Sequence, residues 1–157
     1  MKNTIFIIVA FLFLAPAAFG QETADFSGTW TLNKAASKLT DQFSMAPTQI
    51  KIIQSGNDLE VERTSSMLGN AATIKDKFTL DGKECINPGW SDSEKRSTAV
   101  WAVDKASLII TTKISMGDNG DMTIIETYRL RDKQFVIETK GSSSFGEVSE
   151  TQVFDKK

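Results

Sequence analysis

Charged and polar side chains occur at positions where strand alternation turns them toward the inside of a sheet. Glu126 is flanked two residues away on each side by Ile124 and Tyr128, and Arg63 follows Val61 with the same spacing. Residues two apart in a strand share a face, so Arg63, Glu126 and Tyr128 are expected to point toward a core. A buried charge is costly unless it is paired and hydrogen-bonded. Such side chains either satisfy one another or bind the polar end of a ligand.

Gln152 joins this group because it shares a strand face with Val148 and Phe154. A register effect that turns Arg63 outward is an open alternative. Catalysis is another, with Glu126 and Tyr128 as the acid and base of a hydrolase or isomerase. We nevertheless expect no enzyme and no catalytic residue, because a pair of carboxylates can always be chosen from 20 acidic residues.

The chain has no histidine and one cysteine, Cys85, which removes the commonest catalytic and metal sites. A Ser-His-Asp or Cys-His arrangement is impossible, and a zinc or iron site would depend on carboxylates alone. The Asp-Asn-Gly-Asp run at 118–121 lacks EF-hand spacing and is expected to be a turn. We expect Cys85 to be buried, the alternative being a disulfide between chains. No metal and no cofactor is expected.

Residues 1–20 have the pattern of a secretory signal. Residues 5–15 form an apolar core after a lysine, and Ala18 and Gly20 supply small residues for cleavage before Gln21. The apolar run is shorter than the roughly 18 residues that a membrane span needs, so stable membrane insertion is not expected. We therefore expect a secreted or periplasmic protein.

The mature chain, 21–157, has the length of a single domain of about 100–150 residues. The whole chain carries 18 basic and 20 acidic residues, a net charge of −2, and loss of Lys2 with the leader makes it one unit more negative. Both signs are interspersed, so we expect no nucleic-acid partner. The final Lys156 and Lys157 are expected to be frayed.

Short alternating segments rich in Ile, Val, Thr, Phe and Trp dominate the mature chain, and helix-period patterns are nearly absent. Ten short strands at this spacing predict an all-β barrel or sandwich. The expected strands are 28–33, 48–54, 59–64, 73–80, 83–86, 98–103, 108–114, 122–131, 134–140 and 148–155.

Tight turns and long loops alternate along the chain. In an up-and-down meander every second connection lies at the same end, so all long loops are expected at one end and all tight turns at the other. This asymmetry favours a barrel with a closed bottom and an open mouth over a Greek-key sandwich. The expected tight turns are 55–58, 81–82, 104–107 and 132–133, and the long loops are 34–47, with room for a helical turn at 35–39, and 65–72, 87–97, 115–121 and 141–147.

Gly28 lies two residues before Trp30 at the start of the first expected strand. This Gly-x-Trp resembles the first strand of lipocalins and their calycin relatives, and its continuation resembles small secreted lipocalin-like bacterial proteins. The resemblance implies an all-β, antiparallel up-and-down barrel of about eight to ten strands, with the tryptophan plugging the closed end. The alternative interpretation is that this segment is an ordinary aromatic strand at the start of a sandwich or an open sheet.

The resemblance implies that the barrel sequesters or carries a small hydrophobic or amphipathic ligand. Fatty-acid-binding calycins hold a carboxylate with an interior Arg and Tyr, and Arg63 and Tyr128 would be that pair. The candidate ligand-binding residues are Trp30, Arg63, Trp101, Glu126 and Tyr128 inside the barrel, and Phe43, Met67, Leu68 and Trp90 at its rim.

The chain departs from the lipocalin pattern at one point. Lipocalins stack a late arginine over the first-strand tryptophan, but the last expected strand has none, which leaves Arg129 or Arg131 as candidates. A ten-stranded relative or a looser barrel therefore stays open. The rival function is a protein-interaction module with a filled barrel, in which apolar residues of the long loops hold a protein partner.

Overall fold

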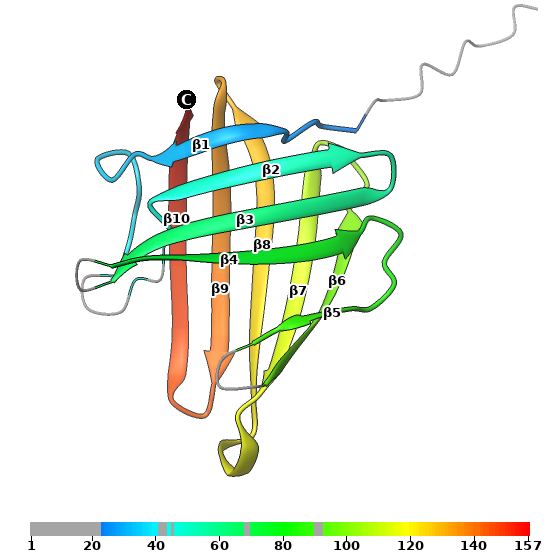
Figure 1. Cartoon of the computed structure of the whole chain (residues 1–157), viewed down its shortest axis with the longest axis vertical. Helices are drawn as coiled ribbons and strands as arrows, with labels where there is room; N and C mark the ends of the chain where they lie inside the picture. The colour runs from blue at the N-terminus through cyan, green and yellow to red at the C-terminus, as the bar shows by residue number, and fades with distance from the viewer. Residues whose placement is uncertain (1–22, 41–43, 45, 68–69, 90–92) are drawn as a thin grey trace, which may run out of the picture.

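The computed structural model describes residues 23–40, 44, 46–67, 70–89 and 93–157. The signal predicted at 1–20 lies outside these residues and stays a prediction. The described residues form ten strands, labelled in Figure 1, and one short 3-10 helix. The strands are β1 (Gly28–Leu32), β2 (Gln49–Ser55), β3 (Asp58–Met67), β4 (Asn70–Thr79), β5 (Cys85–Pro88), β6 (Glu94–Trp101), β7 (Ser107–Ser115), β8 (Asp121–Arg131), β9 (Gln134–Ser143) and β10 (Gly146–Lys156), and the helix is η1 (Gly117–Asn119). Within the described ranges, no helix is long and apolar enough to cross a membrane.

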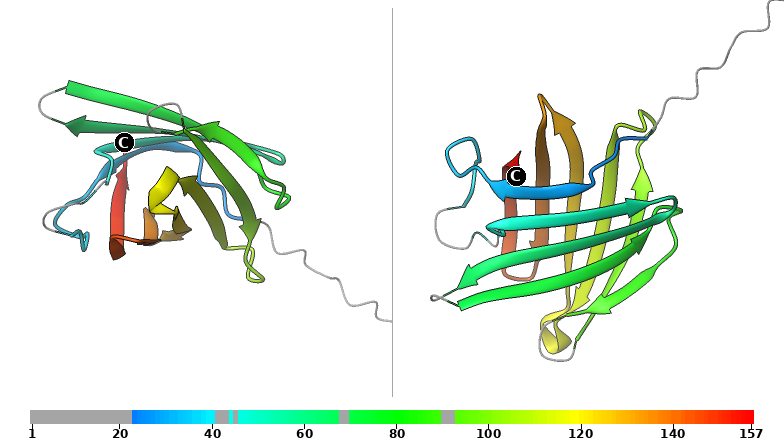
Figure 2. Two further views of the ribbon diagram at one scale, coloured as in Figure 1. Left: turned by 90° about the horizontal axis from the view of Figure 1, so that it is seen from below. Right: turned by 45° about the horizontal axis from the view of Figure 1, so that its top comes forward.

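All ten strands join one sheet in the order β4-β3-β2-β1-β10-β9-β8-β7-β6-β5. Neighbours in sequence pair antiparallel except β4 with β5, and β1 pairs with β10 to join the two ends of the chain. The first four strands cross the last five at a steep angle in Figure 1, and Figure 2 shows the sheet curled around one interior. The fold is therefore an antiparallel up-and-down barrel, closed except between β4 and β5.

All ten expected strands are confirmed, whereas two of the expected long loops are wrong. Only two residues separate β3 from β4, and only two separate β9 from β10. These strands extend further than alternation indicated, because ladder hydrogen bonds continue through small and polar residues that carry no apolar pattern. The mouth of the barrel is therefore built partly from strand ends.

The first long connection runs beside β10 and contains no helix at 35–39. Asn33 Oδ1 accepts a hydrogen bond from the backbone N–H of Ala36 at 3.0 Å, which closes a local turn. Lys38 then forms an antiparallel bridge with Thr151 on β10. The expected helical turn is wrong because backbone groups of this segment pair with the exposed edge of β10 instead.

The expected hairpin at 81–82 is also wrong, since β4 and β5 do not pair. Gly82 has a φ of 78°, and its N–H donates to the carbonyl of Ala99 at 3.1 Å. Asp81 forms an isolated bridge with Val100. The backbone of the Asp-Gly turn therefore bonds β6, and the chain continues into β5, which pairs with β6 rather than with β4.

The packed core fills the end of the barrel that holds the β2–β3, β6–β7 and β8–β9 turns, which we call the closed end. Trp30 is 3% exposed, and its indole N–H donates to the carbonyl of Phe26 at 2.9 Å. Phe26 is fully buried, stacks on Trp101 with ring centroids 5.8 Å apart and meets Tyr128 edge-on at 6.0 Å. Complete burial of one such side chain contributes about 1.5–3 kcal/mol. Trp30 plugs the closed end, as expected.

A lysine, not an arginine, covers Trp30. Lys156 Nζ lies 5.4 Å from the centroid of the indole ring, within cation–π range. Arg129 and Arg131 are exposed on the outer face of β8, so both expected candidates are wrong. The expected fraying is wrong as well, because Lys156 pairs with Trp30 in register and the N–H of Lys157 donates to a β1 carbonyl at 2.9 Å.

Side chains close the seam between β4 and β5. Asn87 is buried, and its amide accepts from the backbone N–H of Lys77 at 2.8 Å and donates to the backbone carbonyl of Lys77 at 2.9 Å. One side chain thus replaces two bonds of a strand ladder. The Sγ of Cys85 accepts from the N–H of Thr79 at 3.2 Å, and Cys85 is half-buried, so its expected burial is only partial.

The substitution Asn87→Ala should reduce the free energy of unfolding by about 2 kcal/mol, because it leaves two backbone groups of Lys77 without partners. Urea unfolding followed by far-ultraviolet circular dichroism measures this loss. The control is Asn119→Ala in the exposed β7–β8 connection, which should change stability by less than about 0.5 kcal/mol. An equal effect of the two substitutions would contradict the role of Asn87 in the seam.

Candidate functional site

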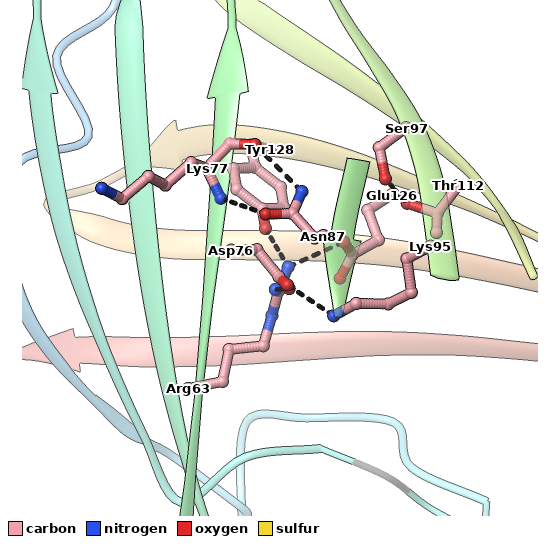
Figure 3. A network of polar contacts seen from close by, with 9 residues as sticks. All are labelled: Arg63, Asp76, Lys77, Asn87, Lys95, Ser97, Thr112, Glu126 and Tyr128. Atoms are coloured by element: carbon pink, nitrogen blue, oxygen red, sulfur yellow. Dashed lines mark hydrogen bonds and ion pairs between the residues drawn. The ribbon is translucent and has the colours of Figure 1, made fainter. Parts of the chain in front are cut away.

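Five polar side chains meet inside the barrel at mid-height (Figure 3), and we call them the Arg63 network. Four of them alternate with apolar inward residues two positions away along their strands, whereas Lys95 lies between Ser93 and Ser97 at that spacing. The network consists of Arg63 from β3, Asp76 from β4, Lys95 from β6, and Glu126 and Tyr128 from β8.

The Arg63 guanidinium is the centre of this network. Its Nη1 donates to Asp76 Oδ2 at 2.8 Å, and its Nη2 donates to Glu126 Oε2 at 2.8 Å and to the hydroxyl of Tyr128. Lys95 Nζ donates to the other oxygen of Asp76. Asp76 is therefore shared by two cations, and each charge in the network has an opposite charge in contact with it.

The network marks the boundary between a packed and an open half of the interior. On the side of the closed end, Leu108 and Phe135 are fully buried, as is the ring of Tyr128. Toward the long loops, the inward-facing Ile74 is 43% exposed and Val148 is 37% exposed. The interior above the network is thus open to solvent at Ile74 and Val148, although Ile114 on β7 in the same half is only 3% exposed, whereas the aromatic core below the network is sealed.

Three members of the network keep part of their surface accessible, whereas Asp76 and Tyr128 are buried. The side chains of Arg63 and Lys95 are 17% and 16% exposed, and that of Glu126 is 16% exposed. Ile124 lies two residues before Glu126 on the same face of β8, on the side away from the closed end. Thr112 on β7 and Gly141 on β9 lie beside Ile124 in register. The polar side chains of the Arg63 network therefore adjoin a partly apolar inner surface around Ile124.

Burial and ion pairing set the protonation states in the network. Burial lowers the pKa of Arg63, but the charges of Glu126 and Asp76 and the hydroxyl of Tyr128 outweigh it, so the pKa lies above its ordinary value and the guanidinium stays charged. Burial raises the pKa of Tyr128, against the opposing effect of Arg63. The phenol stays protonated, so its oxygen accepts from Arg63 and its proton remains available to donate.

A second polar cluster fastens the first long connection to β10. Glu150 Oε1 accepts from the N–H of Thr40 at 2.9 Å and from its hydroxyl at 2.6 Å, and Glu150 Oε2 accepts from Gln152 at 3.2 Å. Burial raises the pKa of Glu150, but these hydrogen bonds hold it below its usual range. Gln152 points inward as expected, yet it bonds Glu150 rather than Arg63.

The structure brings together three of the predicted ligand-binding residues, Arg63, Glu126 and Tyr128. It places Trp30 and Trp101 in the packed closed end, below the network. Of the predicted rim residues, Phe43, Leu68 and Trp90 lie outside the described residues, and of Met67 only the backbone is described. The assignment of all these residues to ligand binding stays a prediction.

Sequence reasoning missed Asp76 and Lys95. Asp76 alternates with Ile74 and Phe78, the same signal that singled out Glu126, and could have been found in the same way. Lys95 follows a serine and precedes Ser97 at the same spacing, so no apolar neighbour marked its face. Only the register of β6 against β5 and β7 turns it inward.

The ten-stranded barrel with a nearly closed sheet is a calycin fold, of the type found in fatty-acid-binding and lipocalin-like proteins. Lipid binding protein 8 of Caenorhabditis elegans superposes with a TM-score of 0.62 at 12% identity, over 84% of this chain and 95% of that protein. The zebrafish ileal bile acid-binding protein, solved with cholic acid, gives a TM-score of 0.59 at 15% identity, over 84% and 98% of the two chains.

The REP1-NXSQ fatty acid transporter is a third similar structure, with a TM-score of 0.56 at 17% identity, over 83% of this chain and 95% of that protein. At these identities the likeness shows the fold alone. No family model and no curated protein matches the sequence. The organisms named among these structures are animals, so the comparisons give no support to the bacterial origin that the sequence suggested.

Tyr128 is the only tyrosine of the chain, so tyrosinate absorbance reports on it alone. Its raised pKa means that the unfolded chain, with a pKa of about 10, releases the phenolic proton first. Stability should therefore be intact below about pH 10 and fall above it by about 1.4 kcal/mol per pH unit. Absorbance should rise only as the chain unfolds. In Tyr128→Phe, the free energy of unfolding should lack this dependence on pH. Titration of the tyrosine near pH 10 in the folded chain would contradict the prediction.

Proposed function

We propose that the protein binds a small hydrophobic or amphipathic molecule in the open half of the barrel. The apolar part would lie against the inward faces of Ile74, Ile124 and Val148, and the polar head would contact the Arg63 network. The observation that carries this proposal is the contrast between the fully buried side chains below the network and the inward-facing Ile74 and Val148 above it, which are 43% and 37% exposed. Binding sites of this kind are concave, largely apolar and anchored by a few polar groups.

The comparisons support this reading at the level of ligand class. The similar structures are named as a lipid binding protein, a bile acid-binding protein and a fatty acid transporter. These names describe non-enzymatic binding of hydrophobic molecules in the same kind of barrel. A particular ligand does not follow from them, because the fold hosts sites that differ in their side chains.

The chemistry of the network supports binding rather than catalysis. Glu126 Oε2 is already engaged in an ion pair with Arg63 at 2.8 Å, so this oxygen is not free to contact a reacting group. Tyr128 keeps its proton because burial raises its pKa, so a phenolate base is not available near neutral pH. The alternative function, a protein-interaction module, finds support in Phe145, which is 73% exposed at the β9–β10 turn.

A binding test can use the uncharged fluorescent probe N-phenylnaphthylamine. Ile124→Asp places a charge on the inner wall and should weaken probe binding at least about tenfold. The matched control is Ile125→Asp, the next residue, which lies on the outer face of β8 and is 39% exposed. It should leave affinity within about twofold, well under 1 kcal/mol. Equal effects of the two substitutions, or no probe binding by the wild-type chain, would overturn the proposal.

We also propose export of the protein as the predicted signal implies. Expression of the full chain in a secreting bacterial host should yield a product in the exported fraction that begins at Gln21. Intact mass spectrometry measures the cleavage position. A product that retains residues 1–20 and stays in the cytoplasm would contradict the proposal. An exported product that begins at another residue would contradict the cleavage position but would still support export.

A further inference from the structure

We infer that the barrel selects amphipathic molecules with an uncharged polar head and discriminates against free carboxylates. The inference rests on the proposed function and specifies its ligand class. It follows from the charge balance of the Arg63 network and from the hydrogen-bonding groups that the network leaves available. It runs against the carboxylate-binding role that the Arg63–Tyr128 pair suggested by resemblance.

The two cations of the network are already neutralised by its two carboxylates. Arg63 contacts both Asp76 and Glu126 at 2.8 Å, and Lys95 contacts Asp76. Glu150 adds a further inward carboxylate, in register with Glu126 through Thr139, and its hydrogen bonds to Thr40 and Gln152 bring no compensating charge. Among the described inward-facing residues of the open half, the balance is therefore not positive.

A ligand carboxylate would enter this site without a free counter-charge. To reach the guanidinium of Arg63 it would have to displace Glu126, the more accessible of its two carboxylate partners, since the side chain of Asp76 is only 6% exposed. Displacement leaves Glu126 partly buried without its cation, which is strongly unfavourable. A ligand carboxylate that stays above the network meets two carboxylates already in place and loses its hydration.

An uncharged head group that both donates and accepts hydrogen bonds matches the donors and acceptors that the Arg63 network leaves without partners among the described residues. Within the described part of the chain, Glu126 Oε1 accepts no hydrogen bond, and the phenolic proton of Tyr128 has no acceptor. To the residues that the structure describes, Lys95 Nζ makes one bond of the three it can donate. The hydroxyl of Thr139, beside Glu126 in register, is buried and has no partner there. A hydroxyl or amide head group can complete these bonds without disturbing the ion pairs.

The test compares probes that share one tail and differ only in the head: dodecanol, dodecanoic acid and dodecylamine. Isothermal titration calorimetry at neutral pH, below the aggregation limit of each probe, gives their dissociation constants. We expect dodecanol to bind the wild-type protein at least about tenfold more tightly than dodecanoic acid. Equal or tighter binding of the acid would overturn the inference while leaving the proposed function standing. Absence of binding by all three probes would instead count against the proposed function.

Glu126→Gln tests the cause of the selectivity. It frees Arg63 from one carboxylate while keeping an amide oxygen in reach, so the affinity for dodecanoic acid should rise about tenfold relative to that for dodecanol. The matched control is Glu138→Gln on the outer face of β9, which makes the same change in net charge and should leave both affinities unchanged. An unchanged acid-to-alcohol ratio in Glu126→Gln would contradict the mechanism.

A second variant changes the charge in the opposite direction and keeps the inference testable if Glu126→Gln fails to fold. Lys95→Met removes one of the two cations that hold Asp76 and makes the network one unit more negative. Dodecylamine should then gain at least about tenfold in affinity relative to dodecanol. No gain in a variant with a native circular dichroism spectrum would contradict the inference.

Discussion

Pairing of the charges around Arg63 is the constraint on which the rest of the barrel depends. The four charged members come from β3, β4, β6 and β8, so the network joins the two sides of a sheet that has no ladder between β4 and β5. The ion pair of Asp76 with Lys95 crosses that gap directly. Because an uncompensated buried charge is far more costly than a paired one, every member must be positioned by its strand for the others to be tolerated.

Such a network does not follow from stability alone. Apolar residues of similar volume often replace buried ion pairs without loss of stability. The polar layer also lies where the packed core ends, with fully buried aromatic side chains beneath it and exposed inward-facing Ile74 and Val148 above it. A layer at this boundary can contact a molecule in the open half, and its own ion pairs determine which head groups it accepts.

Aromatic packing at the closed end holds the Arg63 network in position. Phe26, Trp30, Tyr128 and Phe135 pack with ring centroids 5.1–6.0 Å apart. Tyr128 belongs to both parts, since its ring is packed in this cluster and its hydroxyl accepts from Arg63. The aromatic core therefore orients the network, and Asn87 and the first long connection hold the barrel wall around it.

Alternation alone determined much of this protein. The period-two pattern predicted the ten strands and the inward direction of Arg63, Glu126 and Tyr128, because the side to which a residue points is a local property of an extended chain. The same pattern in Ile74, Asp76 and Phe78 would have revealed a fourth member. The absence of histidine likewise limited the available chemistry before any fold was known.

The tertiary structure decided which of these residues meet. Arg63 and Glu126 are 63 positions apart, and their contact depends on the registers of all strands around the barrel between them. The same dependence on register explains why Gln152 bonds Glu150 rather than Arg63 and why Lys156 covers Trp30. It also explains why the Asp81-Gly82 turn bonds β6. Strand direction and facing are encoded within a few residues, whereas charge balance inside the barrel arises only when distant strands are brought into register.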